Sequence, residues 1–114
     1  MNPLPTHIQV GPMRYTLAID QAAINEINPT AFGRTRNKEQ SIVLSAGQGP
    51  DQEADTVLHE TLHACFTVAG ISERMTDTLA EETINALSPL LLDTLRRNPE
   101  LVAYLLDTPA QEAS

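Results

Sequence analysis

The alternation of apolar and polar residues predicts short strands in the first half of the chain. Residues 7–10 and 13–19 alternate around a Gly-Pro pair, which is typical of a β-hairpin with a tight turn. Residues 32–35 and 41–45 flank the polar segment RNKEQ and predict a second hairpin. Of the four expected strands, SIVLS at 41–45 is the most apolar.

Helical signals dominate from residue 50 onward. Gly49 and Pro50 supply an N-cap and a proline at the first helical position, and Gly70 supplies a C-terminal stop, so we expect a helix over residues 50–69. A shorter helix is expected between the hairpins, over residues 20–27. Strands followed by helices indicate the α+β class, with a small antiparallel sheet of two hairpins packed on a C-terminal set of three helices.

The last two of these helices lie beyond residue 75. The first should begin near Thr76 or Thr78 and end at residue 97, with a bend at Pro89. An Asn-Pro pair then opens a short amphipathic helix. Four of its apolar residues are expected to face the core: Leu101, Val102, Leu105 and Leu106.

Composition narrows the possible functions. The 114 residues carry 15 Asp and Glu against 7 Lys and Arg, a formal net charge of −8. Nucleic-acid backbones and anionic membranes both need clustered cations, so neither is expected as a partner. The N-terminus lacks the pattern of a signal peptide and no apolar run approaches a membrane span, which favours a cytoplasmic protein. We expect one domain over residues 1–109 and a frayed tail over 110–114.

The segment HETLH, residues 59–63, carries the candidate chemistry. On a helix, where each residue advances 100°, Leu58 and Cys65 fall on one apolar stripe, so Cys65 is expected as a buried free thiol. His59 and His63 lie at the rim of this stripe, one turn apart. Both imidazoles can reach one point at the zinc–histidine bond length of about 2.0–2.1 Å. Alternatively, both are merely solvated.

Glu60 is the candidate general base. It lies further round the helix, towards solvent, where it could reach a water held by the metal rather than the metal itself. Zinc lowers the pKa of such a water, and a carboxylate can accept its proton as the water attacks a substrate. The HExxH spacing therefore predicts zinc at His59 and His63, with Glu60 as the base.

A catalytic zinc site needs a third protein ligand. The next helix supplies three carboxylates: Asp77, Glu81 and Glu82. A shift of twenty-two residues superimposes the apolar patterns of the two helices and puts Glu81 at the position of His59. Glu82 then points away, so Glu81 is the preferred ligand, with Asn85 one turn later as a supporting donor. Glu81 could instead close a capping box with Thr78.

HETLH resembles the zinc-binding motif of the zincin metallopeptidases, and Glu81, eighteen residues after the second histidine, resembles the third ligand of gluzincins. Gluzincins carry an aspartate one turn later, where this chain has Asn85. The layout, including the segment RRNPEL, is also similar to small HExxH proteins encoded by phages and prophages. The resemblance implies a zincin-like fold and a bacterial cytoplasm as location. It also implies Zn²⁺ at His59, His63 and Glu81, Glu60 as base, and an extended substrate along an edge strand, here SIVLS.

Two functions follow. The first is a zinc-dependent metallopeptidase that hydrolyses a peptide bond of a protein or peptide substrate. The second is a non-catalytic interaction module of a phage-type protein, braced by zinc, which the small size favours because little room is left for a cleft. Asp55 could accept the second ring N–H of His59 or serve as a surface acid at the helix start. Four side chains are available as oxyanion donors: His7, Tyr15, Arg74 and Tyr104.

Overall fold

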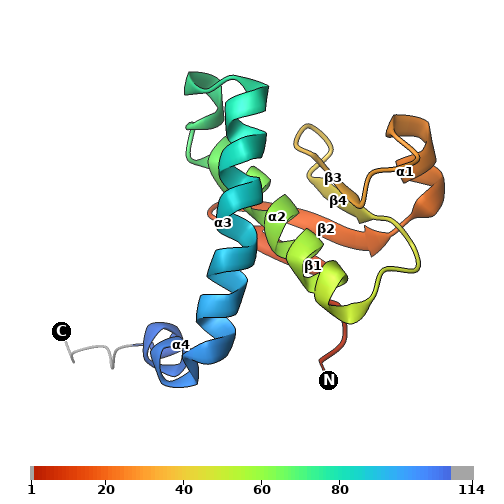
Figure 1. Ribbon diagram of the computed structural model, residues 1–114. Helices are drawn as coiled ribbons and strands as arrows, with labels where there is room; N and C mark the ends of the chain where they lie inside the picture. Colours follow the sequence, from red (N-terminus) through yellow and green to blue (C-terminus); the bar gives the residue numbers. More distant parts are fainter. Residues whose placement is uncertain (1, 109–114) are drawn as a thin grey trace.

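The computed structural model describes residues 2–108 and shows a small α+β domain. Within these residues, a four-stranded mixed sheet is accompanied by four α-helices and one 3₁₀ turn (Figure 1). The predicted fold class is therefore confirmed. The expected tail over 110–114 and the domain end at residue 109 lie outside the described residues.

The sheet has the strand order β1-β2-β4-β3. Its strands are β1 (His7–Val10), β2 (Met13–Ile19), β3 (Gly33–Arg36) and β4 (Ser41–Leu44). Both predicted hairpins form, since β1 pairs antiparallel with β2, and β3 with β4. The expectation of a wholly antiparallel sheet was wrong, because β2 and β4 pair in parallel. Parallel neighbours need a crossover connection, which α1 (Gln21–Ile27) and β3 supply.

The most apolar strand lies inside the sheet. All four residues of β4 are buried between neighbours on both sides, so the prediction that SIVLS is the edge strand was wrong. The two edges are taken by β1 and by β3, which has the polar sequence GRTR. Charged side chains are the usual choice at an edge, where unpaired backbone groups would otherwise attract another strand.

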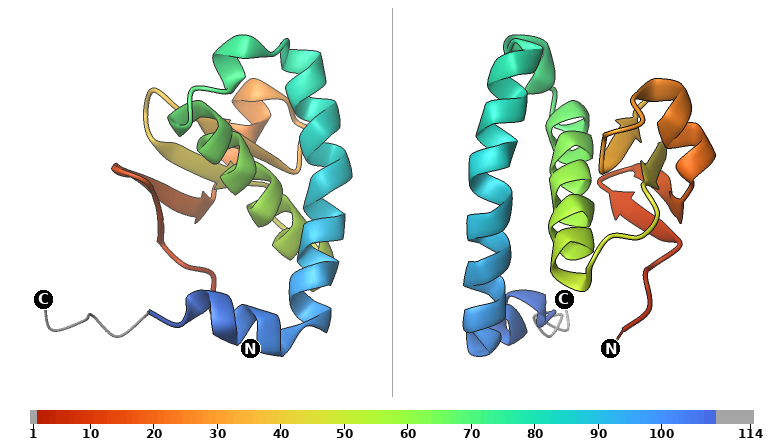
Figure 2. Two further views of the ribbon diagram at one scale, coloured as in Figure 1. Left: turned by 90° about the vertical axis from the view of Figure 1, so that its left-hand side faces the viewer. Right: turned by 45° about the vertical axis from the view of Figure 1, so that its right-hand side comes forward.

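The remaining helical segments are α2 (Pro50–Val68), η1 (Ser72–Arg74), α3 (Asp77–Arg97) and α4 (Pro99–Leu106). Helix α2 lies between the sheet and α3 (Figure 2). The predicted ends are confirmed where the local signal is strong. Gly70 follows α2 with a φ of +76°, and the Thr76 side chain caps α3 by accepting a hydrogen bond from the Leu79 N–H at 3.1 Å.

The core fills the space between the sheet and α2. Its buried residues are Val10, Tyr15, Leu17, Ile42, Leu44 and Ala64. Cys65 is a free thiol, as predicted, but it is only partly buried against this core. Within residues 2–108, no helix is long and apolar enough to cross a membrane.

Helix α4 departs from its prediction. Leu101, Leu105 and Leu106 are 43%, 60% and 77% exposed instead of facing the core, and only Val102 of the four is half-buried. The reason is geometric, since α4 turns off the end of α3 and lies away from the sheet (Figure 1). Its apolar periodicity predicted a buried face, but no second layer covers that face in the described chain.

Candidate metal centre

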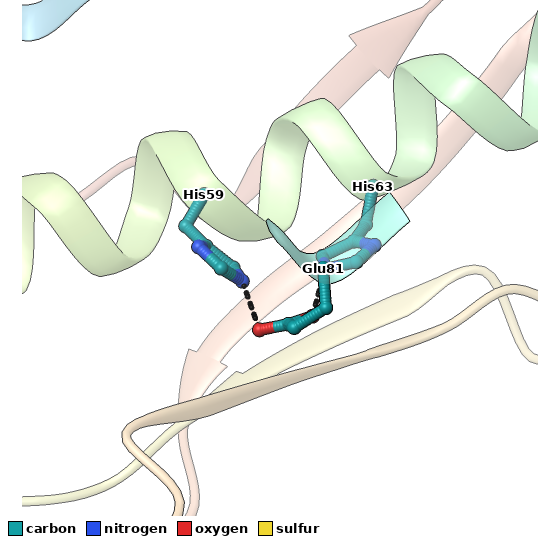
Figure 3. Close-up of side chains that lie close together, drawn as sticks. All are labelled: His59, His63 and Glu81. Carbon is teal, nitrogen blue, oxygen red and sulfur yellow. Dashed lines mark hydrogen bonds and ion pairs between the residues drawn. The ribbon is translucent and has the colours of Figure 1, made fainter. Parts of the chain in front are cut away.

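The two histidines of HETLH converge on one carboxylate. His59 Nε2 lies 3.0 Å from Oε1 of Glu81, and His63 Nε2 lies 2.8 Å from Oε2 (Figure 3). The four-residue spacing places both rings on one face of α2, with centroids 4.9 Å apart. Helix α3 then carries Glu81 against them. The structure therefore brings together the three residues that the sequence singled out as ligands.

These three residues fit a zinc ion. One ligand atom from each lies within 4.8 Å of the other two. Tetrahedral zinc with bonds of about 2.0–2.1 Å needs ligand atoms roughly 3.4 Å apart, a change that side-chain rotation can supply. Two imidazole nitrogens and one carboxylate oxygen are a donor set of catalytic zinc sites, and they leave a fourth position for another ligand. The side chains of His59 and His63 are 14% and 24% exposed, so solvent reaches the cluster.

The alternatives to Glu81 are not supported. The N-cap of α3 is Thr76 rather than Thr78, so Glu81 does not close the capping box that was considered for it. Glu82 is exposed and does not belong to the cluster. Asn85 lines the space beside Glu81, and its supporting role stays a prediction.

Glu60 is buried, which corrects the expectation that it faces solvent. Only 6% of the residue is exposed. The hydroxyl of Thr35 on β3 lies 2.8 Å from the carboxylate Oε1 and 2.9 Å from the Glu60 backbone oxygen, and donates to them. The other carboxylate oxygen, Oε2, lies 3.9 Å from His59 Nε2. The helical wheel failed here because β3 covers the side of α2 that the apolar pattern left polar.

Two residues of β3 that sequence reasoning missed shape this contact. Gly33 and Thr35 share the strand face towards α2. A Cβ on Gly33 would lie 2.8 Å from Cγ2 of Thr56 and 3.1 Å from Cγ of Glu60, so only glycine permits this approach without displacement. The sequence feature that could have indicated this packing is the alternation of small residues with arginines in GRTR.

The cluster lies in a cleft of about 1070 Å³. Helix α2 forms the floor, β3 and the loop before it form one wall, and η1 with the first turns of α3 forms the other. The expectation that so small a chain leaves little room for a cleft was therefore wrong. Its lining includes His59, Glu60, His63 and Phe66 on the floor, Phe32, Gly33 and Thr35 on one wall, and Glu73, Asp77 and Glu82 on the other.

The free edge of β3 borders this cleft. The backbone N–H of Ser45 donates to the oxygen of Phe32 at 2.8 Å, next to the Gly33–Leu44 pair of the β3–β4 ladder. Hydrogen-bonded and non-hydrogen-bonded pairs alternate along an antiparallel ladder. The backbone N–H and C=O groups of Gly33 and Thr35 therefore point away from β4, towards the free edge.

The supporting roles considered for other residues are not realised. The carboxylate of Asp55 accepts a hydrogen bond from the buried Ser88 on α3 at 2.7 Å, so its partner is neither His59 nor solvent alone. None of the four candidate oxyanion donors lines the cleft: His7, Tyr15, Arg74 and Tyr104. Tyr15 is a core residue whose hydroxyl donates to Oδ1 of Asn37 at 2.8 Å, and burial raises the pKa of its phenol.

Comparisons of the chain with protein-family models, curated proteins and solved structures found no match.

Proposed function

We propose that the chain is a zinc-dependent metallopeptidase of the zincin type, acting on a protein or peptide. One observation carries the proposal. His59, His63 and Glu81 converge beside the buried carboxylate of Glu60, on the floor of a cleft that a free strand edge borders. A buried carboxylate that keeps one oxygen on the cleft side is costly for a purely structural helix.

Each part of the site has a role in peptide hydrolysis. His59, His63 and Glu81 would hold zinc, which when bound polarises a carbonyl and lowers the pKa of water. Glu60 would take a proton from the attacking water and return it to the leaving amine, so that one water is consumed and a carboxylate and an amine form. Thr35 holds Oε1 of Glu60, which leaves Oε2 for the proton. The free backbone groups of Gly33 and Thr35 would pair with an extended substrate.

The test compares metal content with activity in protein purified without a histidine tag. Wild-type protein should carry about one zinc per chain by elemental analysis and cleave an unfolded basic protein. Glu60→Gln keeps the shape of the side chain and removes the base, so zinc should stay bound while the cleavage rate falls by roughly 10²-fold or more. Equal cleavage by both proteins would contradict the role of Glu60.

A second candidate is the non-catalytic module braced by zinc. It is favoured by the position of Glu81, because a metal held there would tie α2 to α3. In that case zinc would bind and stabilise the protein, and both wild type and Glu60→Gln would be inactive. The same pair of measurements separates the two candidates.

A further inference from the structure

The charged side chains that line the cleft are almost all acidic. One of them is a base, Arg34, and six are acids: Asp55, Glu60, Glu73, Asp77, Glu81 and Glu82. The lining therefore contributes −5 to a formal net charge of −8 for the whole chain. The acidity of the protein is concentrated at the candidate site rather than spread evenly over the surface.

Three of the six acids have partners within the site. Asp55 accepts from Ser88, Glu60 accepts from Thr35, and Glu81 contacts both histidines. A bound zinc ion would also offset the charges of Glu60 and Glu81. These acids therefore do not decide which ligand the cleft prefers.

The other three acids, Glu73, Asp77 and Glu82, form the wall made by η1 and the start of α3, here called the acidic wall. All three are exposed, and no ion pair within residues 2–108 includes them. Arg34 is the one base of the lining, and no ion pair within residues 2–108 joins it to these three acids.

Local structure accounts for only one of the three charges. Asp77 lies in the first turn of α3, where a carboxylate is stabilised by the helix dipole. Glu82 lies beyond that turn, and Glu73 lies in the short η1 segment. On the floor of the cleft, Glu60 is more than nine-tenths buried and keeps Oε2 on the cleft side. The Glu60 carboxylate indicates that a ligand binds in the cleft, and the acidic wall indicates that the preferred ligand is positively charged.

We propose that the cleft selects cationic peptide segments, with the three carboxylates of the acidic wall as the determinants. The substrate backbone would pair with the free edge of β3 while Lys or Arg side chains extend across the cleft to the acidic wall. This inference rests on the proposed function, because the scissile bond has to lie at Glu60. Charges on the wall act over about 8 Å at physiological ionic strength, so the ammonium group of a lysine has to come within that distance of a wall carboxylate.

Binding of matched peptides tests the inference without requiring cleavage. Two fluorescent decapeptides of equal length differ only in carrying Lys or Gln at alternate positions, and their affinities are measured by anisotropy with zinc-loaded Glu60→Gln. The Lys peptide should bind about tenfold more tightly at 50 mM salt, and the difference should largely disappear at 0.5 M salt. Equal affinities of the two peptides, or no binding of either, would overturn the inference.

Matched variants assign the effect to the wall. The double variant Glu73→Gln, Asp77→Asn should lower the affinity for the Lys peptide about fivefold and leave the affinity for the Gln peptide unchanged. Glu26→Gln with Glu100→Gln removes the same charge from exposed positions outside the cleft and should change neither affinity. Equal weakening by this control would assign the preference to net charge and overturn the role of the wall. Glu82→Gln, at an exposed helical position, replaces the double variant if that one does not fold.

Cleavage by the wild type, scored separately, distinguishes the two proposals. A Lys preference that the wall variant removes, without cleavage of either peptide, would support the acidic wall and contradict the peptidase. Cleavage of both peptides with equal kcat/KM and equal affinity would support the peptidase and overturn the acidic wall.

Discussion

Thr35 controls the surroundings of the Glu60 carboxylate. Its hydroxyl is the donor within 2.8 Å of Oε1, and Glu60 is almost fully buried. Thr35→Val keeps the shape of the side chain but leaves the carboxylate without this donor, so the free energy of unfolding should fall by about 1–3 kcal/mol in urea titrations at pH 7.

Thr35→Ser is the matched control for this prediction. It keeps the hydroxyl and loses a methyl group, so most of the stability should be retained. Equal losses in the Val and Ser variants would show that packing, and not the hydrogen bond, is what Thr35 contributes.

Because Tyr15 is buried, the free energy of unfolding is expected to fall at alkaline pH. Burial raises the pKa of its phenol above the ordinary value of about 10, and the neighbouring Cys65 adds to the shift. The fold therefore favours the neutral phenol, and its contribution is complete below about pH 10 and is lost as the pH rises through the folded-state pKa. Unfolding titrations between pH 8 and 11 should show a steeper decline for wild type than for Tyr15→Phe. Tyr104→Phe, at a 78% exposed position, should behave like wild type.

The positions of side chains were predictable where the periodicity of a helix determines them. The shared face of His59 and His63 follows from their spacing, and Glu81 was identified by comparing the apolar stripes of two helices that pack together. The burial of Glu60 was not predictable in this way. Its partner Thr35 lies twenty-five residues earlier in the chain, on a strand whose position relative to α2 no helical pattern specifies.

At the scale of elements, the ends of helices followed from local signals. Helix α2 begins at Pro50 and is followed by Gly70, and α3 begins after Thr76, much as expected. Capping depends on a few adjacent residues, so local sequence is enough to predict it. The parallel pairing of β2 with β4 and the edge position of β3 depend on contacts across the chain. For α4, the amphipathic pattern was real, but a pattern alone does not supply the layer that would cover it.

The close packing of β3 on α2 predicts one substitution that destabilises the protein and a second one that restores part of the lost stability. Gly33→Ala would bring a methyl group within 2.8 Å of Cγ2 of Thr56, and overpacking of this kind costs about 1–3 kcal/mol. Thr56→Ser removes that methyl group and keeps the hydroxyl, which lies 2.8 Å from both the Gln52 backbone oxygen and Oε1 of Gln48.

The rescue is measured as a double-mutant cycle in urea. The double variant should be more stable than Gly33→Ala alone, with a favourable coupling energy of about 1 kcal/mol. Strictly additive losses would show that β3 adjusts its position without pressing on Thr56.

For the whole molecule, few polar contacts hold α3 against α2. The Ser88–Asp55 hydrogen bond and the exposed Arg96–Asp51 ion pair, at 3.2 Å, lie towards one end, and the Glu81 cluster lies towards the other. The buried residues of α3 are Ala80, Ile84 and Ser88, while Leu79 and Leu90 are 50% and 64% exposed. The apolar positions of α3 beside these buried residues are therefore largely open to solvent, and the contacts at Glu81 matter more for how α3 docks.

Zinc should consequently stabilise the fold as a whole. At a free concentration of 100 times the Kd, a ligand adds about 2.7 kcal/mol to the free energy of unfolding. For a domain near 100 residues this corresponds to a rise in Tm of roughly 10 °C or more. A thermal melt of wild type with and without zinc, after treatment with a chelator, measures this rise.

A comparison of Glu81→Gln with Glu82→Gln shows which carboxylate is needed for the zinc-dependent rise in Tm. Glu81→Gln removes the charged ligand that joins α3 to His59 and His63, so most of the zinc-dependent rise should be lost, as it should in His63→Ala. Glu82→Gln removes the same charge one residue away, outside the cluster, and should keep the full rise. Because Gln is as good a helix former as Glu, metal-free melts of the two variants should differ only by the loss of the Glu81 contacts. If the zinc response persisted in Glu81→Gln and vanished in Glu82→Gln, the cluster would not be the metal site, and α3 would be held by some other set of ligands.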